Sequence, residues 1–63
     1  MIRENREKAG YSQERLAELL NISTRQLQRI ETNEYKTSIS TLKKIIEILP
    51  ITDKEIITYI RSK

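Results

Sequence analysis

The 63-residue sequence contains neither cysteine nor histidine, and it has no tryptophan, phenylalanine or valine. Without cysteine no disulfide can hold the fold together, and without cysteine and histidine the usual zinc sites cannot form. Chains below about 70–80 residues need such links, or very regular helix packing, to be stable. Helix packing is therefore what remains, and we expect neither a metal site nor a cofactor.

The chain also lacks a long apolar run and has a single glycine. A membrane-spanning helix needs about 18 or more consecutive apolar residues, and no run approaches that length. The charged start, Met1–Asn5, does not look like a secretory signal, so we expect a cytoplasmic protein with no membrane partner. Because histidine, cysteine and a glycine-rich phosphate loop are all missing, we expect that the protein is not an enzyme.

The net charge of +3 is concentrated in one part of the chain. From Thr24 to Lys44 there are five basic residues and two acidic ones, whereas the remaining residues are neutral in sum. A basic segment of this kind favours a polyanionic partner such as nucleic acid.

With one glycine and one proline, helix ends must be inferred mainly from capping residues and from the spacing of apolar residues. Gly10 and Asn21 suit the left-handed residue after a helix, and Pro50 ends another. Ser12 and Ser23 suit the N-cap position. We predict a single domain over residues 1–63 with an all-α fold of five short helices, at residues 2–9, 13–20, 24–31, 39–49 and 53–61.

Isoleucine accounts for eleven residues and favours strands by propensity, but its spacing here is helical. In the fourth predicted helix, apolar residues recur every three or four positions, which indicates a core-facing stripe of Ile39, Leu42, Ile45, Ile46 and Leu49. In the fifth, which Thr52 would cap, we expect Ile56, Ile57 and Ile60 to face the core.

The second and third predicted helices are joined by about three residues, as in the two-helix arrangement used to enter the DNA major groove. Ala17 is small where the third helix would cross the second. Ile22 would fill the gap between the two helices at the turn. The outward positions of the third helix would then carry Arg25, Gln28 and Arg29.

The stretch Tyr11–Ser23, followed by Leu27–Glu31, resembles the Cro and phage-repressor (Xre-like) family of helix-turn-helix regulators. Gly10 and Gln13 stand where that family has the glycine that ends its first helix and the glutamine that begins its second. The Leu16-Ala17 pair matches the family's Leu-Ala pair. The resemblance runs from Ile2 to about Ile60, and it implies a lambda-repressor-like DNA-binding domain with its helix-turn-helix in the second and third helices.

Three positions depart from the family pattern. The family's turn glycine is Asn21 here, and its loop glycine after the third helix is Asn33. Asparagine is the usual substitute where φ is positive, so we expect both residues to be left-handed. The family's proline before the fourth helix is Thr37, which predicts a less rigid loop.

The resemblance implies double-stranded DNA as the partner. The residues expected to face base edges are Thr24, Arg25, Gln28 and Arg29. Arginine pairs with guanine O6 and N7, glutamine with adenine N6 and N7, and the threonine methyl group can touch a thymine methyl group. Residues expected to contact phosphates are Gln13, Ser23, Thr32, Asn33 and Lys36. By the resemblance, Gln13 would also brace a side chain of the recognition helix.

Two further expectations follow from the resemblance. Arg6 and Glu31 would form a partly buried ion pair with a structural role, because removing one partner strands the other. Ile48, Ile51 and Tyr59 would contribute to the surface of a homodimer, although a lone exposed isoleucine is also ordinary in a monomer.

The predicted function is a sequence-specific transcriptional regulator, a repressor that binds as a dimer to half-sites about one helical turn apart. We expect it in a bacterial or phage-type cytoplasm, associated with the nucleoid when bound, with no small-molecule ligand in this domain. One alternative is a helical protein-interaction module that has lost DNA binding, against which the polar and basic residues Arg25, Gln28 and Arg29 argue. Another is the DNA-binding part of a larger sensor-regulator.

Overall fold

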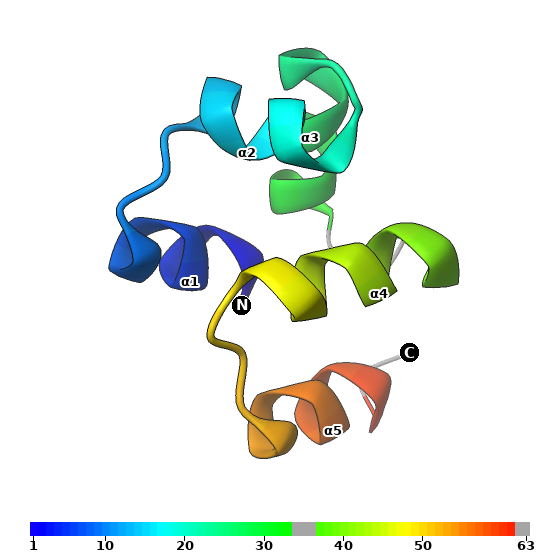
Figure 1. Cartoon of the computed structure of the whole chain (residues 1–63). Helices are drawn as coiled ribbons and strands as arrows, with labels where there is room; N and C mark the ends of the chain where they lie inside the picture. Colours follow the sequence, from blue (N-terminus) through cyan, green and yellow to red (C-terminus); the bar gives the residue numbers. More distant parts are fainter. Residues whose placement is uncertain (34–36, 62–63) are drawn as a thin grey trace.

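The computed structural model describes residues 1–33 and 37–61, and within these ranges it contains five α-helices and no strand (Figure 1). The helices are α1 (Ile2–Ala9), α2 (Gln13–Leu20), α3 (Thr24–Thr32), α4 (Ile39–Ile48) and α5 (Asp53–Arg61). The all-α fold predicted from the apolar spacing is confirmed. Relative to the predicted bounds, α3 is one residue longer and α4 is one residue shorter.

Three of the helices begin at a serine that caps them. The hydroxyl oxygens of Ser12, Ser23 and Ser38 each accept a hydrogen bond from the backbone N–H three residues further on, at 3.0, 3.1 and 3.3 Å. Each bond satisfies one of the N–H groups that the first turn of a helix leaves without a partner. The short polar stretches between the apolar stripes therefore set where α2, α3 and α4 start.

The turns after α1 and α2 depend on left-handed residues. Gly10 has φ of 80° and Asn21 has φ of 59°, and no other described residue has a positive φ. The expectation that Asn33 is also left-handed was wrong, because its φ is −137°. The Asn33 N–H still bonds to the carbonyl of Arg29 at 3.0 Å, so α3 ends with an ordinary helical hydrogen bond.

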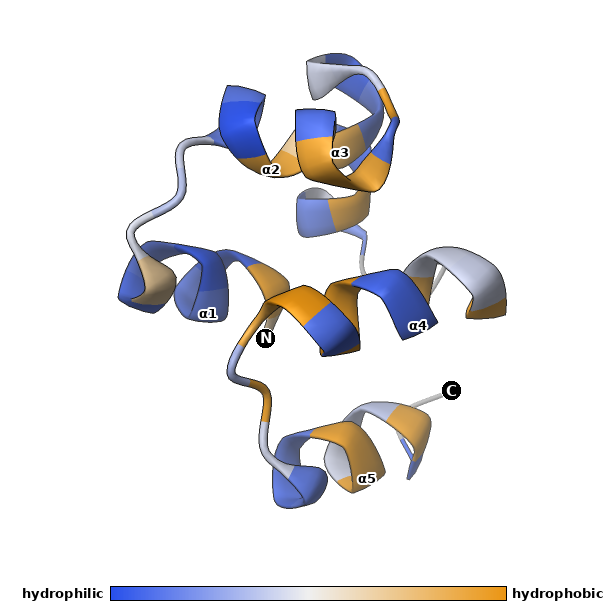
Figure 2. Ribbon diagram, in the orientation of Figure 1, coloured by the Kyte–Doolittle hydropathy of each residue, from blue (hydrophilic) through white to orange (hydrophobic). Residues whose placement is uncertain are grey.

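The core lies between α1, α2, α3 and α4. Figure 2 shows the hydrophobic residues of α2 and α3 on the side that faces α4. Ala17 is 2% exposed in the tightly packed α2–α3 pair, and Leu27 of α3 is fully buried. The central cluster consists of Ile2, Leu16, Ala17, Leu20, Leu27, Ile45 and Leu49. None of the described helices is both long enough and apolar enough to cross a membrane.

The orientation of α5 differs from the prediction. Ile57 and Ile60 are 50% and 58% exposed, so the expectation that they face the core was wrong. Ile56 is half-buried, and Tyr59, which was not expected to face inward, is buried. The side chain of Glu55 accepts a hydrogen bond from the buried Asn5 amide of α1 at 3.1 Å. This contact lies on the same side of α5 as the buried Tyr59, since residues four apart share one face of a helix.

The predicted stripe on α4 was wrong at its first residue. Ile39 is 63% exposed, because it opens the helix at the end remote from the core cluster. Leu42, Ile45 and Leu49, which follow at intervals of three or four residues, are buried as predicted.

Candidate nucleic-acid interface

The exposed face of α3 carries the residues predicted to contact bases. Arg25, Gln28 and Arg29 are exposed, and Thr24 at the start of the helix is half-buried. Leu27 anchors the opposite face in the core. With 3.6 residues per turn, burying residue 27 turns residues 25 and 29 directly outward and places Gln28 on the flank toward α2.

A surface hollow of about 550 Å³ runs along this face of α3. It is lined by two guanidinium groups, two side-chain amides, one hydroxyl group and one apolar side chain, so it can receive both polar and apolar groups. The lining residues are Arg25, Gln28, Arg29, Ile30, Thr32 and Asn33.

The two arginines of this face, Arg25 and Arg29, differ from Arg6 and Arg15 in their pairing. Arg15 of α2 forms an ion pair with Glu18, and Arg6 of α1 forms one with Glu31. Within residues 1–33 and 37–61, no carboxylate pairs with Arg25 or Arg29. Their positive charge is therefore available to an outside anion.

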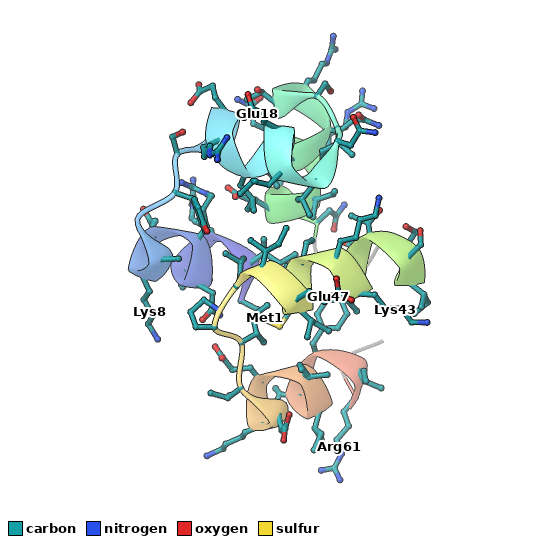
Figure 3. The ribbon with its side chains drawn as sticks, viewed as in Figure 1. Met1, Lys8, Glu18, Lys43, Glu47 and Arg61 are labelled. Carbon is teal, nitrogen blue, oxygen red and sulfur yellow. The ribbon has the colours of Figure 1, made fainter. Side chains whose placement is uncertain are left out.

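Two basic residues of α4 and α5 point away from this face. Figure 3 shows Lys43 and Arg61 projecting from α4 and α5 away from the α2–α3 pair. Both side chains belong to exposed residues. Lys43 and Arg61 are therefore not part of the basic surface of α3.

The residues expected to contact phosphates have varied surroundings. Ser23 is exposed, and its hydroxyl accepts a bond from the backbone of Gln26 while keeping its own proton to donate. Thr32 is exposed and donates to the carbonyl of Gln28 at 2.9 Å, and Asn33 is half-buried. Lys36 lies outside the described residues.

The Arg6–Glu31 ion pair implied by the family resemblance is present beneath the interface. Arg6 Nε donates to Glu31 Oε2 at 2.7 Å, and Nη2 lies 3.4 Å from Oε1. Arg6 Nη1 also donates to the carbonyl of Tyr11 at 2.9 Å. The side chains are only 11% and 4% exposed, so the pair joins α1 to the end of α3 largely out of contact with water.

Gln13, the first residue of α2, lies between this ion pair and the surface. Its Nε2 donates to Glu31 Oε1 at 3.1 Å, and its Oε1 accepts from Gln28 Nε2 at 3.4 Å. Gln13 is half-buried in this position. The resemblance implied that Gln13 braces a side chain of the recognition helix, and in the structure that side chain is Gln28.

One residue of this region was not found by sequence reasoning. Arg3 lines a second hollow of about 600 Å³ together with Gln13, Gln28, Glu31 and Thr32. The available signal was its position three residues before Arg6, which puts both arginines on one side of α1. Because the sequence does not show that α1 packs beside α3, Arg3 could not be assigned to the interface from the sequence.

The residues expected at a dimer surface are mostly covered. Ile48 and Ile51 are partly buried and pack against the core, and Tyr59 is only 8% exposed. The exposed apolar residues of α5 are instead Ile57 and Ile60. No group of acidic residues that could hold a metal ion occurs in the described ranges.

Comparison with known proteins gives one match. The sequence model of the helix-turn-helix family matches residues 2–56, whereas no curated protein and no solved structure matches the chain. The match includes all of α1 to α4, and thus every described residue of the interface, and the family is a DNA-binding, non-enzymatic one. The chain therefore belongs to the helix-turn-helix family of Cro/C1-type, Xre-like regulators and is a DNA-binding domain of that family.

Proposed function

We propose that this protein is a sequence-specific transcriptional repressor that inserts α3 into the major groove of double-stranded DNA. The observation that carries the proposal is the grouping of Arg25, Gln28 and Arg29 on the exposed face of one helix whose other face is anchored by Leu27. The major groove admits an α-helix, and its base edges present hydrogen-bonding groups that such side chains can distinguish.

Each residue of the α3 face suits a particular partner. Arg25 and Arg29 can give two hydrogen bonds each to guanine O6 and N7. Gln28 suits adenine, and the methyl group of Thr24 suits a thymine methyl group at the start of the helix. These contacts would determine sequence preference.

A second set of contacts would position α3 on the DNA without reading bases. Ser23 and the free N–H groups at the start of α3 can bind a phosphate, as helix N-termini commonly do. Thr32 and Asn33 border the hollow at the other end of the helix, and Lys36 follows in the chain. Arg3 adds a positive charge on the α1 side.

The protein would act in the cytoplasm as a homodimer on two half-sites about one helical turn apart. The exposed Ile57 and Ile60 of α5 would meet their copies in the partner, with Ile48 and Ile51 contributing at the edge. A small domain that occupies an operator blocks access by other proteins simply by being there, which favours repression over activation.

The test is a titration with duplex DNA selected from a randomised pool, at two salt concentrations. Because several phosphates would be neutralised, affinity should fall steeply as salt rises. Arg25→Ala should weaken binding to the selected duplex by about tenfold or more while changing binding to random duplex much less. Arg61→Ala is the matched control, since it removes the same charge from a helix that points away from α3.

If Arg25→Ala weakens binding to the selected and the random duplex equally, Arg25 contacts phosphate and does not read bases. A folded protein that binds neither duplex would overturn the proposal and favour a protein-interaction role instead.

A further inference from the structure

We infer that Arg3 binds a DNA phosphate, so that the DNA-contacting surface includes α1 as well as the helix-turn-helix pair. The inference rests on the proposed function, because the phosphate belongs to the strand that lies beside α3 once this helix occupies the major groove. It goes beyond that function by assigning one phosphate contact to a residue outside the α2–α3 pair.

The guanidinium group of Arg3 has no carboxylate to neutralise it. Arg3 is exposed, and among the residues that the structure describes no carboxylate forms an ion pair with it. Its neighbour Glu4 is paired with the amino group of Met1 at 2.7 Å. The other arginine of α1, Arg6, is paired with Glu31. The side-chain N–H donors of Arg3 are therefore unused within the described part of the chain and can bind an outside anion.

The hollow that Arg3 borders adjoins the exposed face of α3. Its volume is about 600 Å³, and Gln28 and Thr32 line both this hollow and the one along α3. These two residues are four positions apart, so they form one edge of α3, and the two hollows meet there. A DNA strand that follows this edge comes next to Arg3.

The hollow has a positive charge, because the carboxylate among its described lining residues is compensated. The Glu31 side chain is 4% exposed and accepts a hydrogen bond from Arg6 at 2.7 Å. The hydroxyl proton of Thr32 is already donated to the carbonyl of Gln28, at 2.9 Å. Of the described residues that line the hollow, Arg3 is therefore the one that offers both a positive charge and several unused donors.

The dimensions of the groove bring a DNA backbone to this place. An α-helix with its side chains is about 10–12 Å across, and the major groove is about 12 Å wide. A helix that fills the groove therefore has one sugar-phosphate backbone beside each flank. Arg3 lies at the flank of α3 that faces α1, so the anion that it meets is a phosphate of the nearer strand. A guanidinium group can give two parallel hydrogen bonds to phosphate oxygens.

The first experiment measures the affinities of the wild type, Arg3→Ala and Lys8→Ala for the selected and the random duplex over a range of salt concentrations. Lys8→Ala is the matched control, because it removes the same charge from the same helix. Figure 3 shows Lys8 projecting from α1 away from the α2–α3 pair, and the residue is exposed. Because Arg3 is exposed and has no described partner, its replacement should leave the Tm unchanged, so that a loss of affinity is not a loss of fold.

Arg3→Ala should weaken binding to both duplexes by the same factor, about three- to tenfold at about 50 mM salt. The slope of log K against log salt concentration should become less steep by about 0.9, which is the contribution of one phosphate. Base preferences should not change, because a phosphate contact carries no sequence information. Lys8→Ala should change the affinity by less than about twofold, since salt screens a charge that is remote from the DNA.

A second experiment locates the phosphate. Single phosphates of the selected duplex are replaced, one at a time, by neutral methylphosphonates. One replacement should weaken binding of the wild type several-fold and have little effect on Arg3→Ala, because the two changes remove the same contact. Inorganic phosphate, added to the free protein at constant ionic strength, should cause no saturable NMR shift at Arg3, because the site needs a phosphate that DNA holds in place.

Equal salt slopes for Arg3→Ala and the wild type overturn the inference and leave the proposed function standing. So does a methylphosphonate scan in which no position loses its effect in Arg3→Ala. Saturable binding of inorganic phosphate at Arg3 also overturns it, since Arg3 would then belong to a site for a free anion. If the wild type binds neither duplex, it is the proposed function that fails.

Discussion

At the α3 end of the molecule the exposed side chains are basic or carry an amide, namely Arg25, Gln28 and Arg29, whereas the exposed face of α5 carries Ile57 and Ile60. The two ends are also supported differently. Beneath α3 lies a buried ion pair that reaches the surface through Gln13, and α5 is held to α1 by the contact between Glu55 and Asn5. Surfaces this different suit different partners, and we propose DNA for α3 and an apolar protein surface for α5.

The largest expected effect concerns the support beneath α3. Glu31→Ala leaves the Arg6 guanidinium largely buried without its partner, and we expect the free energy of unfolding to fall by about 3–5 kcal/mol. Glu18→Ala removes a carboxylate from the exposed pair with Arg15 and should cost at most about 1 kcal/mol. Urea denaturation of both variants measures the difference. Equal, small losses would show that burial does not distinguish the two ion pairs.

The next effect concerns the apolar end. Replacing both Ile57 and Ile60 by Asp should abolish dimerisation, because two charges would have to be buried at the contact. We expect at least about a tenfold loss of affinity for a duplex with two half-sites and little change for a duplex with one, since linked sites reinforce each other. Sedimentation measures the loss of the dimer, and titration with each duplex measures the change in affinity.

Leu19→Asp is the matched control for that variant, because Leu19 is an exposed apolar residue on α2, remote from α5. If the double variant stays as dimeric as the wild type, the apolar end is an ordinary exposed surface.

A smaller effect separates the two asparagines that stand where the family has glycine. Asn21 is left-handed, so Asn21→Gly relieves strain while adding freedom to the unfolded chain, and the two changes should nearly cancel. Asn33 has φ of −137°, so Asn33→Gly adds only the freedom and should destabilise by about 0.5–1 kcal/mol. Thermal unfolding of the two variants measures the two changes in stability. A larger loss for Asn21→Gly than for Asn33→Gly would contradict the backbone conformations found at the two residues.

The smallest effect concerns the link between α1 and α5. Hydrogen bonds from the Thr52 backbone and from the Asn5 side chain to the Glu55 carboxylate lower the pKa of Glu55 below 4.5. A lowered pKa means that the stabilisation is complete above about pH 4.5 and is lost as the pH falls through the folded-state pKa. The difference in Tm between the wild type and Glu55→Gln should therefore narrow below pH 4.5. A difference that does not vary with pH would show that the carboxylate charge plays no part.

Much of the α2–α3 unit could be predicted because its signals are local. Serine before a helix and asparagine or glycine after it act on hydrogen bonds within a few residues, so Ser12, Ser23 and Asn21 mark the helix ends directly. The outward position of Arg25 then follows from helix periodicity and the apolar positions of α3. The ion pair between Arg6 and Glu31 was expected only because of the family resemblance.

The failures have long-range causes. Asn33 has a residue type that permits a positive φ, but only the path of the chain after α3 decides whether one is needed. α5 has isoleucines on several sides, so its spacing allows more than one inward face. The face that the structure buries contains Tyr59 and also Glu55, which contacts Asn5, fifty positions away.

The sequence by itself determined that this chain forms short helices, where most of them begin and end, and which residues of α3 stand opposite its buried leucine, because capping and helical periodicity act over one or two turns. Only the tertiary structure decided which face α5 buries, that Arg3 borders the interface, and that Gln13 joins a buried carboxylate to Gln28. Those arrangements depend on the packing of α1 against α3 and α5, and no local pattern specifies which side chains such packing brings within hydrogen-bond distance.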